Sequence, residues 1–211
     1  MMVLDIALKN KVEEVLKQRP RKHVRVSDVL ACVDKESGGV PIFNASDVLL
    51  KQNLIAASRI TGLTEAQIRQ AMTITDGPYK GMLSKFRCEP GYWKWAKAYA
   101  PTFKKNPEDL ILLACSFGVG QKMSRWLVTG TPVHEWAPLI RKFMGSLSLQ
   151  IVYCAGDLDN LLVHANGDRP LAFTRYNAGP SATNKSPAYE AYGLKVAAKA
   201  KQFEEELKKD V

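Results

Sequence analysis

Apolar residues recur every three to four positions along most of the chain, the spacing of one face of an α-helix. Val29, Leu30 and Val33, for example, form an apolar face that opposes charged neighbours. Helices are predicted over residues 4–18, 27–36, 46–60, from 64 onward, as a pair over 134–159, over 169–176 and over 187–208. The chain is therefore expected to be mostly helical.

Short polar and glycine motifs indicate where several helices begin and end. Ser27 is the predicted N-cap of the second helix, and Gly38-Gly39 is expected to end it. Thr64 followed by Gln67 is a capping-box pattern for the fourth helix. The third helix is expected to bury one side, made of Leu49, Leu50, Leu54 and Ile55.

The best strand candidate is residues 82–88, read as one arm of a small hairpin. Residues 107–113 lead into a Ser116 motif, after which a helix is predicted from about Val119. The fold class predicted is α+β: a mostly helical, single domain over residues 1–211 with a small β-hairpin and a C-terminal helix at 187–208. The sequence contains neither an internal repeat nor an obvious linker.

The composition adds a strong positive charge, +9 at neutral pH with a pI near 9.4, which implies an anionic partner. Nucleic acid, an anionic membrane and bacterial cell wall all qualify. The basic residues are spread along the chain without a dense basic tail, which disfavours a nucleic-acid-binding arm. No apolar run approaches the roughly 20 residues of a membrane span, and residues 1–16 look like an amphipathic helix rather than a signal peptide.

The four cysteines, Cys32, Cys88, Cys115 and Cys154, show neither Cys-x-x-Cys pairing nor nearby histidine ligands. A zinc site is therefore not expected, and the sequence calls for no cofactor. Each cysteine has apolar neighbours, so buried thiols in a reducing compartment are predicted. The three histidines are isolated, without a Ser-His-Asp arrangement.

Three motifs follow one another along the chain: Lys35-Glu36-Ser37-Gly38-Gly39, then Ser116-Phe117-Gly118-Val119-Gly120-Gln121, then Arg175-Tyr176-Asn177-Ala178-Gly179-Pro180. Together they resemble the muramidase and lytic transglycosylase superfamily, which includes goose-type lysozyme. The resemblance covers residues 26 to about 196 and implies a lysozyme-like fold. It also implies cleavage of the β-1,4 bond between N-acetylmuramic acid and N-acetylglucosamine in peptidoglycan.

The resemblance implies that Glu36 is the general acid, because a glutamic acid at a helix end, partly desolvated, can hold the proton that the leaving oxygen needs. Glu89, in a Phe-Arg-Cys-Glu-Pro segment similar to one in phage N-acetylmuramidases, would be a second carboxylate lining the cleft. The 53 residues between them, with a predicted helical insertion at about 44–76, exceed the usual spacing. Two alternatives for Glu89 stay open: that it is the true acid, or that it only forms a strand-end ion pair with Arg87 or a lysine.

The resemblance also implies substrate-binding residues. Gly118 would allow a close approach or a positive φ, and the Gln121 amide would bind an N-acetyl group or the catalytic carboxylate. Ser116 would hold that carboxylate, Tyr176 would point its hydroxyl toward it, and Asn177 would brace the turn or bind sugar. Without the resemblance, these motifs would be an N-cap, a turn and a helix stop.

The chemistry of some aromatic and polar side chains outside these motifs indicates whether they bind sugar or pack in the core. Tyr92 and Trp93 could stack on sugar faces, whereas most of the other large aromatics are expected in the core. Gln150 is expected to pack in the core. Tyr189, Tyr192 and Val196 fit a trailing Tyr…Val element of the superfamily.

Several functions are consistent with these motifs. The main expectation is a peptidoglycan glycosidase, a phage endolysin or virion-associated lysin, whose partners are glycan strands and anionic wall polymers. The alternatives are a lytic transglycosylase that forms 1,6-anhydro products, and a catalytically inactive phage structural or DNA-binding protein. Without a signal peptide, the protein is expected in the host cytoplasm before release to the wall, or in a virion.

Overall fold

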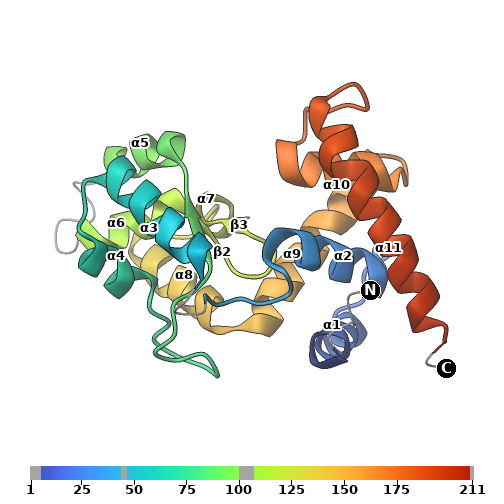
Figure 1. Ribbon diagram of the computed structural model, residues 1–211, viewed down its shortest axis with the longest axis horizontal. Coiled ribbons are helices and arrows are strands. Elements are labelled where there is room, and N and C mark those ends of the chain that lie inside the picture. Colours follow the sequence, from blue (N-terminus) through green and yellow to red (C-terminus); the bar gives the residue numbers. More distant parts are fainter. Residues whose placement is uncertain (1–5, 44–46, 100–106, 210–211) are drawn as a thin grey trace. The chain divides into compact units, whose positions relative to one another are not determined.

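The computed structural model describes residues 6–43, 47–99 and 107–209 of the chain, which forms two compact units (Figure 1). One, here called the terminal unit, combines the residues up to Gly39 with those from Ile151 onward. The other, the central unit, spans Val40–Gln150. The predicted starts of the first and third helices, at residues 4–5 and at Ser46, lie outside the described residues, as do residues 44–46 of the predicted insertion.

The terminal unit is helical. Its elements are α1 (Ile6–Gln18), α2 (Val26–Ser37), most of α9 (Leu147–His164), α10 (Arg169–Ala178), the π-helix η2 (Tyr189–Gly193) and α11 (Leu194–Leu207). Helix α2 packs against both α1 and α11, and η2 and α11 pack against α10. The core between them is apolar and includes Val12, Val29, Leu30, Phe173 and Val196.

Most predicted helices of this unit are confirmed, but Ser27 does not cap α2. Ser27 lies inside the helix and is buried, while Arg25 occupies the N-cap position. The Arg25 backbone N–H donates to the Asp28 carboxylate at 2.9 Å. Asp28 is in turn paired with Arg169 at 3.0 Å, so this carboxylate ties the start of α2 to the start of α10.

The central unit combines helices with a three-stranded antiparallel sheet of order β1-β2-β3. Its elements are α3 (Val48–Thr61), α4 (Glu65–Met72), β1 (Phe86–Cys88), α5 (Pro90–Ala98), α6 (Pro107–Ala114), β2 (Cys115–Phe117), β3 (Lys122–Met123), α7 (Ser124–Leu127), the 3-10 turn η1 (Val133–Glu135) and α8 (Trp136–Gly145). The predicted pair over 134–159 corresponds to α8 and α9.

The helix-capping motif predicted for α4 is confirmed. Thr64 and Gln67 form the predicted capping box, with Thr64 N–H donating to Gln67 Oε1 at 3.0 Å and Gln67 N–H donating to Thr64 Oγ1 at 3.3 Å. The buried face of α3 differs from the prediction: Leu50 and Leu54 are buried as expected, whereas Leu49 and Ile55 are exposed. Ala57, one helical turn on, completes the core face in their place.

The β-structure also differs from the prediction. The strand is only Phe86–Cys88, and its partner is β2, 27 residues further on, rather than a hairpin neighbour. After β2 the chain makes a turn and continues as β3, so no helix begins at Val119. The expectation of a small β element in a mostly helical α+β fold is nonetheless confirmed.

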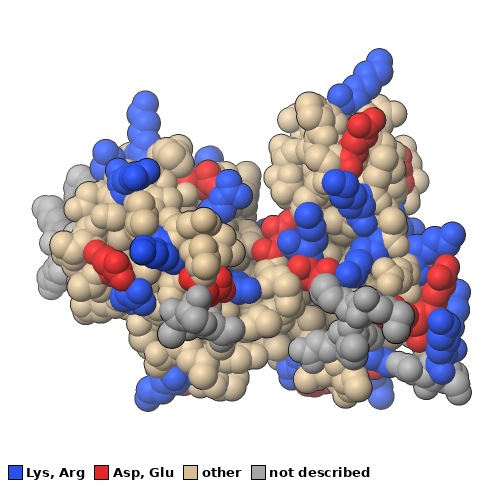
Figure 2. All heavy atoms as spheres, viewed as in Figure 1, with Lys and Arg blue, Asp and Glu red and all other residues tan. Residues whose placement is uncertain are grey.

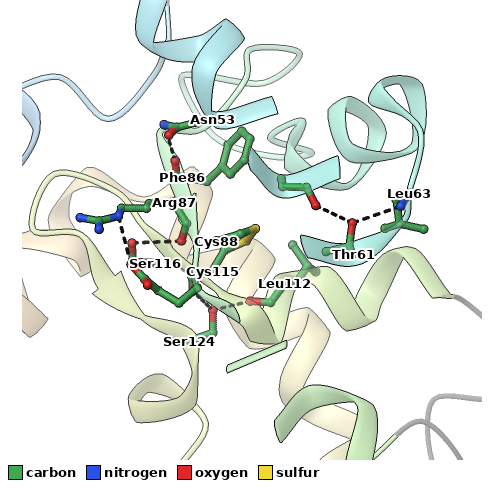
Figure 3. Close-up of a disulfide and its surroundings, with 12 residues drawn as sticks. Asn53, Thr61, Leu63, Phe86, Arg87, Cys88, Leu112, Cys115, Ser116 and Ser124 are labelled. Carbon is green, nitrogen blue, oxygen red and sulfur yellow. Dashed lines mark hydrogen bonds and ion pairs between the residues drawn. A yellow bond between two sulfur atoms is a disulfide. The ribbon is translucent and has the colours of Figure 1, made fainter. Parts of the chain in front are cut away.

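Two of the cysteines are joined, contrary to the prediction of buried thiols. Cys88 and Cys115 lie directly opposite each other on β1 and β2 and form a disulfide (Figure 3). Cys32 and Cys154 are free and buried, as predicted. Because protein disulfides are typical of oxidising environments, the cysteines no longer support a reducing compartment.

Charged side chains of both signs occur over each unit on the face shown in Figure 2. Several form ion pairs, among them Lys199 with Asp34 and Arg141 with Asp109. Within the described ranges, every helix is too short or too polar to span a membrane.

Candidate functional site

Glu36 is the penultimate residue of α2 and is half-buried. The helix ends immediately after it because Gly38 takes a left-handed conformation, with φ of 64°, in which its N–H reaches the Asp34 carbonyl at 2.8 Å. The Gly39 N–H reaches Val33 in the same way. The Gly-Gly pair therefore stops the helix one residue beyond Glu36, as predicted.

The Glu36 carboxylate accepts a hydrogen bond from the Tyr192 hydroxyl. Tyr192 is 156 residues away in the sequence and comes from the π-helix η2 at the start of the last helix. Its side chain is buried, with 7% of its surface exposed. A π-helix inserts extra backbone into a helical turn and is frequent at functional sites, and here it carries the tyrosine that contacts Glu36.

Close packing of η2 on α10 holds this tyrosine in place. Gly193 follows Tyr192, and a Cβ atom at Gly193 would overlap the Thr174 hydroxyl and the Pro170 carbonyl. Thr174 donates in turn to the Pro170 carbonyl at 2.7 Å. A glycine at this position thus lets the two backbones approach closely enough to bury Tyr192.

Burial raises the pKa of Tyr192 above its ordinary value, and the nearby Cys32 and Glu36 groups raise it further. Tyr192 therefore stays protonated well above neutral pH and remains a hydrogen-bond donor to the carboxylate.

Tyr176, expected to point toward the catalytic Glu, is half-buried on α10 beside Cys154. Burial raises its pKa, and the hydrogen bond with the Cys154 thiol adds to the effect. The tyrosine that donates to Glu36 in the described contacts is Tyr192, from the trailing Tyr…Val element. The sequence thus contained a signal for Tyr192, but it did not distinguish Tyr192 from Tyr189.

The Tyr-Asn-x-Gly motif ends α10 and shapes the turn that follows. Asn177 is exposed in the last turn of the helix. Arg175 holds the surrounding loop by donating to the Ala182 carbonyl at 3.1 Å and the His164 carbonyl at 2.8 Å. In this motif, Arg175 therefore supports the loop.

Glu89 lies in the central unit, where it follows β1 and occupies the N-cap position of α5. Its carboxylate forms an ion pair with Arg87 at 3.0 Å, and its backbone N–H donates to the Ala114 carbonyl at 3.0 Å. The ion pair that the structural alternative for Glu89 expected is therefore present, and the role of this carboxylate in catalysis stays a prediction. Arg87 is largely exposed, so the pair is solvated.

The Ser116 motif forms a turn stabilised by its own side chains. The Ser116 hydroxyl donates to Gln121 Oε1 at 3.1 Å, and Gln121 Nε2 donates to the Gly118 carbonyl at 2.9 Å. Ser116 belongs to β2 rather than to a helix cap. Gln121 has a left-handed φ of 46°, and its side chain folds back onto Ser116 and Gly118.

Gly118 has the predicted positive φ, 74°, and its close neighbour is Gln150. Gln150 is buried, as expected of a core residue. Its amide accepts from Val119 N–H at 3.0 Å and donates to the carbonyls of Phe143 and Met144. The close approach expected of Gly118 is therefore made by a core glutamine.

The tryptophans of the central unit and Tyr92 differ in how far they are buried. Tyr92 and Trp93 are half-buried on α5, with the Lys97 ammonium 6.0 Å from the Trp93 ring. Trp95 and Trp136 stack with ring centroids 5.8 Å apart, as expected of core aromatics. Trp126 differs, since 54% of its surface is exposed and Arg125 lies over its ring at 5.5 Å.

The candidate residues therefore form two sets. Glu36 and Tyr192 are in contact in the terminal unit, which also contains Tyr176, while Glu89, Ser116, Gly118 and Gln121 belong to the central unit, within its sheet or next to it. Among the residues that the structure describes, no three His, Cys, Asp or Glu side chains are grouped so as to hold a metal ion. Comparison of the chain with protein-family models, curated proteins and solved structures found no match.

Proposed function

We propose that this protein cleaves the β-1,4 bond between N-acetylmuramic acid and N-acetylglucosamine in peptidoglycan, with Glu36 as the general acid. The observation that carries the proposal is the hydrogen bond from the buried Tyr192 hydroxyl to the Glu36 carboxylate. This hydrogen bond connects the Glu-Ser end of α2 to the tyrosine of the trailing Tyr…Val element, so two segments that carry the resemblance are joined at one carboxylate.

The chemistry follows from what each group can donate. Protonated Glu36 gives its proton to the glycosidic oxygen as the bond to the anomeric carbon breaks, so the leaving sugar departs as an alcohol. Tyr192, protonated at neutral pH, keeps one carboxylate oxygen in a fixed direction throughout. In hydrolysis, a water oxygen bonds to the anomeric carbon and its proton passes to a carboxylate.

Tyr92 and Trp93, half-buried on α5, are candidates for stacking on sugar rings, and Ser116, Gly118 and Gln121 are the residues that the resemblance implies for sugar binding. The positive net charge of the chain favours association with an anionic wall. We propose these residues as substrate contacts and Glu89 as the second carboxylate.

A second candidate reaction is favoured by the ion pair at Glu89. The Arg87 guanidinium holds Glu89 Oε1 at 3.0 Å, so this oxygen is already engaged where hydrolysis would need a base that takes a proton from water. A lytic transglycosylase needs no such base: the 6-hydroxyl of the muramic acid residue attacks its own anomeric carbon. The product then has a 1,6-anhydro end and is lighter by one water.

The proposal is tested by lysis of purified cell walls, followed as loss of turbidity. Glu36→Gln should abolish lysis while the circular dichroism spectrum stays native. The matched control is Asp34→Asn, which removes a carboxylate from the same helical turn but one that is paired with Lys199 at 3.3 Å. That control should remain active.

Two outcomes would count against the assignment. Full activity of Glu36→Gln together with an inactive Glu89→Gln would reverse the roles of the two carboxylates. Absence of lysis by the wild-type protein on walls of several bacterial types would remove the proposed activity itself.

A further inference from the structure

An arginine and a tryptophan are exposed next to each other on α7, in the central unit (Figure 1). Trp126 has 54% of its surface exposed, and the Arg125 guanidinium carbon lies over its ring, 5.5 Å from the centroid. Within the described ranges, arginines such as Arg87 and Arg141 pair with carboxylates, whereas Arg125 forms no ion pair. The proposed reaction uses neither Arg125 nor Trp126.

The helix that carries this pair is held firmly by its two end residues. Ser124, the first residue of α7, is buried, and its hydroxyl donates to the Cys115 carbonyl at 2.6 Å. Leu127, the last residue, is buried as well. Because both ends of α7 are fixed in the core, Arg125 and Trp126 between them are left on the surface.

A column of rings supports the guanidinium from the core side. Arg125 also lies over the Trp95 ring, 5.6 Å from its centroid, and Trp95 stacks on Trp136 at 5.8 Å. Trp136 is buried, and its indole N–H donates to the Thr131 carbonyl at 2.8 Å. The Arg125 side chain therefore packs on a ring that is itself held in place, so a ligand has less side-chain freedom to remove when it binds.

The two exposed side chains together define the chemistry of a ligand. A guanidinium is a planar fork of N–H donors that matches the paired oxygens of a carboxylate or phosphate. An indole offers a large apolar ring, which suits the apolar face of a sugar. A neutral sugar would leave the guanidinium without a partner, and a simple anion would leave the indole uncovered. A sugar that carries an anionic group satisfies both side chains.

Nucleic acid also combines rings with negative charge, but it fits this surface less well. Proteins that bind single strands stack successive bases on several aromatic side chains along a basic groove. In the part of the chain that the structure describes, Trp126 is the one tryptophan with more than half of its surface exposed. A single exposed ring suits a single sugar unit.

We propose that Arg125 and Trp126 form a binding site for an acidic sugar of the cell wall, with Trp126 against the ring and Arg125 on its anionic oxygens. This site shares no residue with the Glu36–Tyr192 pair or the Ser116 turn. The wall as the source of the sugar rests on the proposed function, whereas the binding of an acidic sugar does not. Two wall components have this chemistry: muramic acid, through its lactyl carboxylate, and sugar polymers linked through phosphate.

The first test uses NMR of the wild-type protein labelled at the tryptophan indole nitrogen, with Trp126→Phe to identify the Trp126 signal. The probes are N-acetylmuramic acid, N-acetylglucosamine 1-phosphate and neutral N-acetylglucosamine. N-acetylmuramic acid differs from the neutral sugar only by the lactyl group that bears the carboxylate. At least one acidic sugar should move the Trp126 signal, and the neutral sugar should bind about tenfold more weakly, the effect of one hydrogen bond to a charged group.

The pattern of responses identifies the source of the ligand. A response to N-acetylmuramic acid alone would assign the site to peptidoglycan itself, and a response to the phosphate sugar alone would assign it to a phosphate-linked polymer. Equal responses to all three sugars, or an unmoved Trp126 signal, would overturn the proposal. A single-stranded oligonucleotide that moves the signal where both acidic sugars fail would also overturn it, in favour of nucleic acid.

The second test measures sedimentation with purified cell walls in the Glu36→Gln background, which is expected to leave the walls intact. Arg125→Ala should weaken binding about tenfold. The matched control is Arg59→Ala, which removes the same side chain and charge from an exposed position of α3 in the same unit, and it should bind nearly as tightly as the parent. Equal weakening in both variants would mean that only the net charge acts and would overturn the proposal.

The two tests separate this inference from the proposed function. The NMR test uses the wild-type protein, so it holds even if Arg125→Ala is destabilised. A protein that binds acidic sugars at Trp126 but cleaves no peptidoglycan would refute only the proposed function. A protein that cleaves peptidoglycan while its Trp126 signal ignores both acidic sugars would refute only the Arg125–Trp126 site.

Discussion

Breaking the disulfide between Cys88 and Cys115 should destabilise the central unit by a predictable amount. The two cysteines are separated by 27 residues, and the bond joins strands of only three residues each. In the chain-entropy treatment, closing a loop of this length stabilises the folded state by about 3.5 kcal/mol at 25 °C. This is a large share of the roughly 5–15 kcal/mol by which most domains are stable.

Reduction is the cleaner perturbation because it leaves both buried side chains in place. The assay is urea unfolding followed by tryptophan fluorescence, since Trp93, Trp95, Trp126 and Trp136 all lie in the central unit. With an m-value of about 1–3 kcal/mol/M, the unfolding midpoint should fall by about 1–3.5 M urea when reductant is added.

The control is the double variant Cys88→Ala/Cys115→Ala, in which reductant should have no effect. This control matters because Cys32 and Cys154 are also present as thiols. A wild-type midpoint that does not move on reduction, with the thiols shown by titration to be free, would refute the reasoning. A shift of the unfolding midpoint of the same size in the double variant would show that reductant acts through Cys32 and Cys154 instead.

Three further predictions concern the terminal unit and the charge of the chain. Burial raises the pKa of Cys32 and Tyr192, so the folded state keeps protons that the unfolded chain releases. The free energy of unfolding should therefore fall as pH rises above about 8.5, where the unfolded thiol ionises, and again above about 10, where the unfolded phenol ionises. Each group should contribute a decline of up to about 1.4 kcal/mol per pH unit, and neither should affect the free energy of unfolding at lower pH. Tyr192→Phe should flatten the second part of that decline, measured by urea unfolding with circular dichroism detection, and an unchanged decline would count against the raised Tyr192 pKa. Gly193→Ala should destabilise the fold by about 1–3 kcal/mol and reduce wall lysis, because the added Cβ would overlap backbone and side-chain atoms of α10. Ala191→Gly, at an exposed position of the same π-helix, controls for helix propensity. Native stability in Gly193→Ala would contradict the packing argument. Lysis of intact walls should weaken as salt shortens the screening length from about 10 Å at 0.1 M to about 3 Å at 1 M, whereas salt-independent lysis would exclude an electrostatic role for the net charge.

Features encoded within a few residues were predictable from the sequence. The Thr64–Gln67 capping box depends on a spacing of three residues, and the end of α2 depends on the conformational freedom of Gly38. Both were placed correctly because the atoms that bond are neighbours in the chain. Ser27 failed as an N-cap because Asp28 in the next position satisfies the backbone N–H of Arg25 instead.

Features that join distant segments were not predictable in the same way. The pairing of β1 with β2 brings Cys88 opposite Cys115 across an intervening helical segment, and no local pattern marks either cysteine as bonded. The partner of Glu36 posed the same problem. Three tyrosines lay in plausible motifs, and the π-helix that brings Tyr192 onto the carboxylate has no signature in the spacing of apolar residues.

The Ser116 motif shows a third limit of sequence reasoning. Its residue types suit sugar binding and turn formation equally well, because both use the same hydroxyl and amide groups. The described hydrogen bonds of Ser116 and Gln121 stabilise the turn itself. Their contact with sugar therefore stays a prediction, to be tested by the effect of Gln121→Ala on KM.

Mass spectrometry of purified peptidoglycan digested with the protein, with Glu36→Gln as the parallel sample, detects the proposed bond cleavage itself. We expect muropeptides cut between N-acetylmuramic acid and N-acetylglucosamine from the wild-type protein, and none from Glu36→Gln. Free reducing ends would identify hydrolysis and would support Glu89 as the second carboxylate, and 1,6-anhydro ends would identify the transglycosylase reaction. Intact glycan strands after wild-type treatment would rule out the proposed cleavage, and the same products from Glu36→Gln would rule out Glu36 as the general acid.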